Sequence, residues 1–511
     1  MKKKLTSLIG KTALGLLIFL FISSCGEHEQ KPPNIIVFLV DDMGLMDTSV
    51  PFVTDTEGTP RSHPLNEYYN TPNMEALAAQ GVRFTNFYAH SVCSPTRSSI
   101  LSGQNSARHR TTNWINAESN NRTKFGPSEW NWKGLDSTST LLPKQLQNGG
   151  YKTIHIGKAH FGPIGSEGEN PTNLGFDVNI AGNSFGHPGS YYGTEGFGHI
   201  AGQKARAVPD LEKYHGQEIH LTEALTLEAK SELSKAIEED KPFFLYLSHY
   251  ALHAPFQSDP RFAANYINSG KDQRAQAYAT LIEGIDKSLG DIIAHVKQAG
   301  IAENTFIIFL GDNGSDAPLP INNGYGSSEP IRGKKGNHWE GGMRVPFIAS
   351  WVSPNEDKIN QSEWNIDANS VQNQIGTILD LFPTISRLGK AEIPTDVTLD
   401  GFDLQTQLAN QRHQERTESF LNHFPHGQHR TNYFTSYVDQ GWKVIYHYPV
   451  EKEPYYELYN LDKDPFESDN LASSRPEQLQ KMMVAMSEKL NDYQALYPEK
   501  DGQEFKPILP N

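Results

Sequence analysis

The sequence is poor in cysteine, because only Cys25 and Cys93 occur among its 511 residues. A disulfide framework needs several paired cysteines, so a small cross-linked secreted scaffold is excluded. Positive charge is also scarce: 45 lysines and arginines stand against 60 aspartates and glutamates, and the formal net charge is −15. A surface of this sign repels phosphate backbones, so we expect no nucleic-acid partner. An anionic substrate would need a local pocket of positive charge.

The N-terminal apolar segment, residues 13–22, is too short to span a bilayer comfortably, and it follows lysines at positions 2–4. This arrangement is typical of an export signal. The segment ends in ISSC at residues 22–25, which resembles a bacterial lipobox, where the cysteine is lipidated and becomes the mature N-terminus. We therefore interpret 1–24 as a lipoprotein signal peptide and 25–33 as a tether, and we expect a lipid-anchored protein of the bacterial cell envelope. An ordinary cleaved signal peptide or an N-terminal membrane anchor is the alternative.

Four short apolar runs indicate the fold of the larger part of the chain. Their β-branched and aromatic composition suits strands that are buried on both faces, as in a parallel sheet. Helical patterns lie between them, at 74–79, 141–148, 221–238 and 275–299, and this alternation predicts an α/β fold. We expect a large mixed, mostly parallel sheet between helices over residues 34–410. The four runs are residues 35–40, 153–156, 243–248 and 306–310.

The pattern changes in the last hundred residues. Short strands at 434–438, 442–447 and 457–460, followed by an amphipathic stretch at 476–496, predict a smaller antiparallel α+β domain over residues 411–511. Its first strand is preceded by the histidine-rich segment 422–430. There His423, His426 and Arg430 are candidates for contacts with the substrate, and a polar surface loop is the alternative. Polar residues at 355–370 and 405–416 predict loops.

Polar residues follow each of the four predicted strands. Ligands in such sheets bind beyond the carboxyl ends of the strands, so these residues point to one shared site. Any one of them alone would be interpreted as a helix cap, but four sets together favour a site. The carboxylate and amide oxygens suit Ca²⁺ or Mg²⁺ and not zinc. The residues are Asp41 and Asp42; Lys158 and His160; His249 and His253; and Asp312 and Asn313.

Four motifs resemble those of one enzyme family, the type I sulfatases of the alkaline-phosphatase-like superfamily. CSPTR at 93–97, followed by LSG at 101–103, resembles the family signature, with Thr96 where serine is common. GKAH at 157–160 resembles the second motif, with Ala159 in place of tryptophan. RGKKG at 332–336, continuing to EGGMRVP at 340–346, resembles the segment that carries an active-site lysine, and Lys335 matches it better than Lys334. LGDNG at 310–314 resembles the metal-ligand turn.

The resemblance implies a hydrolase of sulfate esters. A formylglycine-generating maturase would convert Cys93 into formylglycine (3-oxoalanine), and its hydrate would attack sulfur, with Asp312 as a candidate base. One Ca²⁺ would be bound by Asp41, Asp42, Cys93, Asp312 and Asn313, with Mg²⁺ as an alternative. Arg97 would orient the hydrate, Lys158 and Lys335 would hold the sulfate, and His253 or Lys335 would protonate the leaving alkoxide. His160 would remove the proton that allows sulfate to be expelled.

Export and the lipid anchor favour a sulfated polysaccharide or its oligosaccharides as the substrate. A formylglycine-dependent phosphonate or phosphodiester hydrolase of the same fold is one alternative, and a non-catalytic glycan-binding lipoprotein is another. A zinc phosphatase of the superfamily is disfavoured by Cys93 and by Asn313 beside Asp312.

Overall fold

The four apolar runs form neighbouring strands of one sheet in the computed structural model, which describes residues 31–200, 206–320, 326–427, 429–450 and 453–510. They are β1 (Asn34–Val40), β4 (Lys152–Gly157), β6 (Phe243–His249) and β7 (Thr305–Gly311). The pairs β4–β6, β6–β1 and β1–β7 are parallel. Val40 lies opposite both His249 and Gly311, so the carboxyl ends of these strands are level with one another. This register brings the segments that follow the strands to one edge.

The complete sheet has eight strands in the order β5-β4-β6-β1-β7-β8-β2-β9. Only β8 runs antiparallel to its neighbours. The sheet is therefore mixed and mostly parallel, as the sequence predicts. The outer strands are β5 (Val178–Ile180), β8 (Phe347–Trp351), β2 (Val82–Phe84) and β9 (Ser370–Gln372).

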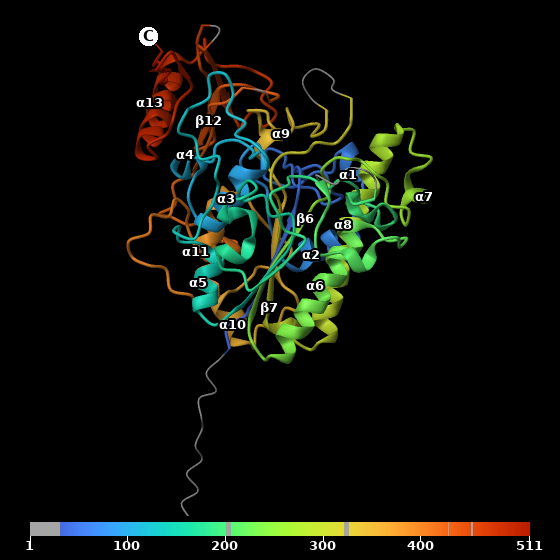
Figure 1. Ribbon diagram of the computed structural model, residues 1–511. Helices are drawn as coiled ribbons and strands as arrows, with labels where there is room; N and C mark the ends of the chain where they lie inside the picture. The colour runs from blue at the N-terminus through green and yellow to red at the C-terminus, as the bar shows by residue number, and fades with distance from the viewer. Residues whose placement is uncertain (1–30, 201–205, 321–325, 428, 451–452, 511) are drawn as a thin grey trace, which may run out of the picture. The chain divides into compact units, whose positions relative to one another are not determined.

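Helices cover both faces of this sheet (Figure 1). Side chains of β1 alternate between two buried cores: Ile36 and Phe38 pack with α2, α6 and α8, whereas Ile35 and Val37 pack with α3, α5 and α11. Because β1 is enclosed on both faces, every one of its positions can be apolar. The longest helix, α8, begins after Asp272, whose side chain accepts a hydrogen bond from Ala275 N. The covering helices are α2 (Pro72–Gln80), α6 (Leu221–Glu238), α8 (Gln273–Gln298), α3 (Cys93–Ser102), α5 (Leu142–Asn148) and α11 (Leu381–Leu388).

Six short helices lie in the connections. Two of them correct the sequence-based prediction, because α10 and α12 form inside segments that were expected to be loops. Of the residues described, no helix is long and apolar enough to cross a membrane. The short helices are α1 (Pro64–Tyr68), α4 (Ser106–His109), α7 (Ala263–Tyr266), α9 (Glu340–Met343), α10 (Ile359–Glu363) and α12 (Gln405–Leu408).

A four-stranded antiparallel sheet forms the C-terminal part, in the order β11-β12-β13-β14. The expected antiparallel sheet and closing helix are confirmed, but β11 was not predicted, and it includes the first residues of the histidine-rich segment 422–430. Its core also takes Ala107 and Phe125 from the larger part of the chain. The elements are β11 (Ser419–Phe424), β12 (Phe434–Asp439), β13 (Trp442–His447), β14 (Tyr455–Asn460) and α13 (Pro476–Asp492).

Four two-residue strands complete the structure, in the parallel pair β3 (Phe87–Tyr88) with β10 (Gly376–Thr377) and the antiparallel pair β15 (Glu499–Lys500) with β16 (Gln503–Glu504). The expected signal peptide at 1–24, Cys25 and most of the tether lie outside the residues that the structure describes.

Candidate active site

The acidic residues after β1 and β7 meet at the carboxyl edge of the sheet. The backbone N–H of Asp42 donates to Asp312 Oδ1 at 2.9 Å, and Asn313 Nδ2 donates to Asp42 Oδ1 at 2.9 Å. Asp41, Asp42, Asp312 and Asn313 are all fully buried. Asp42 has a φ of 58°, a left-handed conformation that aspartate tolerates better than most residues. The local backbone thus directs successive carboxylates into one space.

Two oxygens of this cluster have no hydrogen-bond donor among the described residues: Asp42 Oδ2 and Asn313 Oδ1. Buried oxygens normally have a partner, and leaving one without a partner costs about 1–3 kcal/mol. Ligand oxygens of Asp41 and Asp42 also lie within 4.8 Å of each other and of a His253 ring nitrogen. The donors are mainly hard oxygens, so the residues present fit a divalent cation such as Ca²⁺.

Three buried cations neutralise the acidic cluster. Lys158 Nζ lies 2.7 Å from Asp41, Lys335 Nζ lies 2.6 Å from Asp42 Oδ1, and Arg97 Nη2 lies 2.8 Å from Asp312 Oδ2. Burial raises the pKa of Asp42, but Lys335 and His253 outweigh burial and hold that pKa below its ordinary range. Burial lowers the pKa of Lys335, but Asp42 outweighs it and raises the pKa. Asp42 and Lys335 are therefore charged at neutral pH, whereas burial raises the pKa of Asp41 well above its ordinary value even though Lys158 lies beside it.

The positions of the two predicted catalytic residues Lys158 and Arg97 depend on close packing of the backbone. Gly157 has a φ of 98°, and a Cβ there would lie 1.9 Å from the carbonyl oxygen of Ser248, so only glycine fits. This approach lets Lys158 N donate to the same carbonyl at 2.7 Å. Arg97 is fixed from three sides, because it donates to Asp312, to the Lys158 carbonyl and to Ser248 Oγ.

Cys93 opens α3 and faces His160. The distance from Cys93 Sγ to His160 Nδ1 is 3.4 Å, and both residues are buried. His160 Nε2 lies 2.6 Å from the carbonyl oxygen of Ile115. A carbonyl can only accept, so Nε2 carries the proton and Nδ1 presents its lone pair to residue 93. Burial, with Lys158 nearby, lowers the pKa of His160 well below 6.5, so the ring is a neutral base.

A cavity of about 520 Å³ opens onto this cluster. Cavities of about 940 and 680 Å³ occur elsewhere, but neither is lined by Cys93 or by any residue of the acidic cluster, so size alone does not identify the site. The smaller cavity is the candidate active site because predicted catalytic residues line it. Its lining residues are Cys93, Trp114, Ile115, Asn116, Ala117, His160, Gly186, His187, Arg206, His253, Asp316, Lys335, His429 and Arg430.

Comparison with known proteins agrees with this geometry. The family model for sulfatases matches residues 33–391, which is more than half of the chain. This chain belongs to the sulfatase family. A second family model, the N-sulphoglucosamine sulphohydrolase C-terminal region, matches residues 335–495.

The sulfatase has relatives along most of its length. It is 31% identical over 404 residues to N-acetylgalactosamine-6-sulfatase of Sus scrofa, a match that covers 76% of this chain and 68% of the relative. It is 29% identical over 526 residues to a sulfatase of Formosa agariphila, covering 91% and 89%. The crystal structure of Ps i-CgsB in complex with k-i-k-neocarrahexaose aligns with a TM-score of 0.69 and 25% identity, covering 92% of this chain and 96% of that one. The sulfatase is therefore a sulfuric ester hydrolase.

Two neighbouring lysines of the sulfatase are distinguished by their partners. Lys335 Nζ reaches Asp42, whereas Lys334 Nζ lies 3.2 Å from Asp316. Lys335 is thus the lysine that enters the acidic cluster. His249, which ends β6, contacts Ser288 on α8 at 3.0 Å and does not line the cavity.

The three candidate substrate contacts are separated in the structure. Arg430 lines the cavity, where it donates to Asp316 at 2.6 Å and to the Lys335 carbonyl at 2.8 Å. His423 and His426 are fully buried and lie outside the lining. His423 bonds to Thr435 and to the Leu496 carbonyl. His426 Nε2 lies 2.9 Å from Thr112 Oγ1. Of the three candidates, the structure thus brings Arg430 to the cavity and leaves His423 and His426 outside its lining.

His253 lies between the cavity and the acidic cluster. Its Nε2 is 3.8 Å from Asp42 Oδ2, and its Nδ1 donates to the Ala254 carbonyl at 2.9 Å. The ring of His187 stacks on it, with centroids 5.4 Å apart. Sequence reasoning missed His187, Trp114 and Arg206 because they lie in irregular segments outside the motifs.

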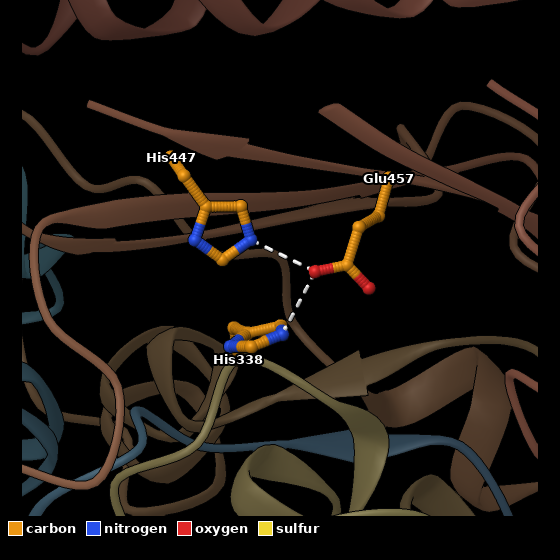
Figure 2. Close-up of side chains that lie close together, drawn as sticks. All are labelled: His338, His447 and Glu457. Carbon is orange, nitrogen blue, oxygen red and sulfur yellow. Dashed lines mark hydrogen bonds and ion pairs between the residues drawn. The ribbon is translucent and has the colours of Figure 1, made fainter. Parts of the chain in front are cut away.

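A second cluster joins His338, three residues after Lys335, to His447 at the end of β13 and Glu457 on β14 (Figure 2). One Glu457 oxygen is 3.0 Å from His338 Nε2 and 2.8 Å from His447 Nε2. The other accepts from Trp339 Nε1 and from the Tyr459 hydroxyl. The carboxylate is thus surrounded by donors from two segments, and it ties the 332–340 segment to β13 and β14.

Proposed function

We propose that this sulfatase removes sulfate esters from a sulfated polysaccharide or its oligosaccharides, using formylglycine at position 93 and one Ca²⁺. The observation that carries the proposal is the cavity that exposes Cys93, His160 and Lys335 beside buried oxygens without partners. A cavity of about 520 Å³ is within the range of small-ligand sites. The relatives named above include an N-acetylgalactosamine-6-sulfatase and a protein in complex with k-i-k-neocarrahexaose, which supports a carbohydrate substrate.

Asp41, Asp42, Asp312 and Asn313 would hold the Ca²⁺, with residue 93 beside them. When bound, the ion would polarise a sulfate oxygen as a Lewis acid. The two carboxylates Asp41 and Asp42 are paired with Lys158 and Lys335. We propose that a cation takes over this neutralisation, so that both ammonium groups become available to the sulfate.

Formylglycine would supply, as its hydrate, one hydroxyl to attack sulfur and a second whose proton must be removed before sulfate leaves. His160 Nδ1 is the atom positioned to accept that proton, because it carries the lone pair of the ring and lies beside residue 93, with the Ser94 hydroxyl as its other neighbour. Arg97 fixes Asp312 from the side of the sheet. His253 Nε2 and Lys335 Nζ are the candidates to protonate the leaving alkoxide from the cavity side. Lys335 carries a proton already, whereas burial and Lys335 lower the pKa of His253 and its Nδ1 holds the ring proton, so Nε2 would first have to take up a proton.

The experiment compares an aryl sulfate, an aryl phosphate and an aryl phosphonate of the same phenol, with purified protein coexpressed with the maturase. We expect the sulfate to be hydrolysed fastest, activity to fall when Ca²⁺ is chelated, and Ca²⁺ to restore it. A phosphonate or phosphodiester rate above the sulfate rate would favour the alternative hydrolase of the same fold. Bound zinc, with activity insensitive to chelation of Ca²⁺, would contradict the metal assignment.

We also propose that Cys25 is lipidated and anchors the enzyme in the bacterial cell envelope, on the basis of the ISSC segment at 22–25. A fatty-acid probe should label the wild-type protein in growing cells and should not label Cys25→Ser. Equal release of both proteins in soluble form would contradict the anchor.

A further inference from the structure

One cation in the wall of the active-site cavity has no acidic partner among the residues that the structure describes. The cavity is lined by three basic side chains, Lys335, Arg206 and Arg430. Lys335 is paired with Asp42, and Arg430 is paired with Asp316. Among the described residues, no carboxylate and no hydrogen-bond acceptor lies within bonding distance of the Arg206 guanidinium.

The Arg206 side chain is nevertheless held in place. Its guanidinium carbon lies 4.9 Å from the centroid of the Phe185 ring, a cation–π distance. Arg206 is half-buried, and its carbonyl accepts from Gly189 N at 2.7 Å. Stacking on a ring occupies the face of the guanidinium and leaves its N–H edge available. That edge matches the paired oxygens of a carboxylate or a sulfate.

The chain has a formal net charge of −15, so the positive charge of Arg206 in the cavity is opposite in sign to the charge of the molecule as a whole. The scissile sulfate belongs beside Cys93 and Lys335, where the metal ligands also lie. Arg206 lies in the same cavity but makes no contact with that cluster, so it is available to a different group of the same substrate.

We propose that Arg206 forms a second anion subsite, which binds a carboxylate or an additional sulfate on the sulfated sugar. The inference rests on the proposed function and narrows its substrate class to carbohydrates that carry at least two anionic groups. Trp114, in the same lining, offers an apolar surface to the sugar ring between them.

The test uses three substrates built on one sugar: a monosulfated form, the same form with a second sulfate, and the same form linked to a uronic acid. Arg206→Gln should lower kcat/KM by about 10- to 100-fold on at least one doubly anionic substrate, mainly through KM, because a charge-assisted hydrogen bond is lost. Its effect on the monosulfated form should stay within about twofold, since that substrate places no anion at Arg206. Comparison of the two doubly anionic substrates shows whether Arg206 binds a second sulfate or a carboxylate.

Arg274→Gln is the matched control, because Arg274 also stacks on a phenylalanine, Phe256 at 5.3 Å, and does not line the cavity. It should leave all three rates unchanged. Equal losses for Arg206→Gln on all substrates, or no loss on any, would overturn the subsite.

Calorimetric binding of the doubly anionic sugars separates this inference from the proposed function. If the wild-type protein binds these sugars but releases no sulfate, the catalytic proposal is wrong. The affinities of the two variants then still test the subsite. Weaker binding by Arg206→Gln than by Arg274→Gln supports the subsite, and equal binding overturns it.

Discussion

At the scale of single residues, the most specific assignment concerns His160. Its Nε2 donates to the Ile115 carbonyl, so Nδ1 carries the ring's lone pair, and Nδ1 lies 3.4 Å from Cys93 Sγ and 3.3 Å from Ser94 Oγ. His160→Ala should therefore impair the release of sulfate and spare the first attack. With an aryl sulfate we expect a burst of about one phenol per enzyme followed by very slow turnover, measured by rapid mixing. Loss of the burst would assign His160 to the first step instead.

His253 can be tested by comparing two leaving groups. A sugar alkoxide needs a proton to depart, whereas a phenolate leaves readily, and general acid catalysis is worth about 10²- to 10⁴-fold. His253→Ala should thus reduce kcat on a sugar sulfate far more than on an aryl sulfate. Equal reductions on both substrates would remove His253 from this role and leave Lys335 as the acid.

At the scale of structural elements, buried strands were the easiest to predict. The runs at 35–40, 243–248 and 306–310 match β1, β6 and β7 within one residue at either end. Burial on both faces requires continuous apolar residues, and that requirement is visible in the sequence. Because parallel strands end at one edge, the residues that follow β1, β4 and β7 could also be assigned to one site.

Elements that depend on tertiary contacts were not predictable in this way. β11 contains Asn422 and His423, polar residues for which a surface loop was one interpretation of the sequence. These side chains can be buried because residues elsewhere in the chain form hydrogen bonds with them: His90 Nδ1 pairs with Asn422, and Thr435 Oγ1 pairs with His423. Arg206 could not be assigned to the cavity for a similar reason, since it belongs to no motif and only the folded chain places it there.

We predict that Glu457 positions the segment that carries Lys335, because its carboxylate connects that segment to β13 and β14. Its carboxylate receives donors from Trp339 and His338 on one side and from Tyr459 and His447 on the other. Glu457→Gln replaces one acceptor with a donor, so we expect the free energy of unfolding to fall by about 1–3 kcal/mol.

The same variant should lower kcat while leaving the substrate range unchanged, because Glu457 does not line the cavity. Denaturant unfolding and steady-state kinetics check the two effects. Glu488→Gln, an exposed change on α13, is the control. Wild-type stability and activity in Glu457→Gln would contradict this role.

At the scale of the whole molecule, buried neutral histidines predict acid sensitivity. Burial lowers the pKa of His423 from 6.5 to about 4 and that of His426 from 6.5 to about 3. Below 6.5 the unfolded chain takes up protons that the folded chain excludes, so the free energy of unfolding falls as pH falls. This stability is complete above pH 6.5 and is lost progressively down to about pH 3, the pKa of His426 in the folded chain.

The melting temperature, measured across that range, should therefore decrease with acidification, and the slope should be smaller in His423→Gln. A substitution of the partly exposed His413 by glutamine is the control and should keep the wild-type slope. An unchanged slope in His423→Gln would show that other groups control acid unfolding.

The central claim is that residue 93 acts as formylglycine and not as a thiol. The most direct measurement follows the mass of the peptide spanning Cys93 in protein made with and without the maturase, together with kcat on an aryl sulfate. We predict that kcat rises in proportion to the aldehyde fraction and is abolished in Cys93→Ala. Full turnover by protein that contains only the thiol would contradict the account.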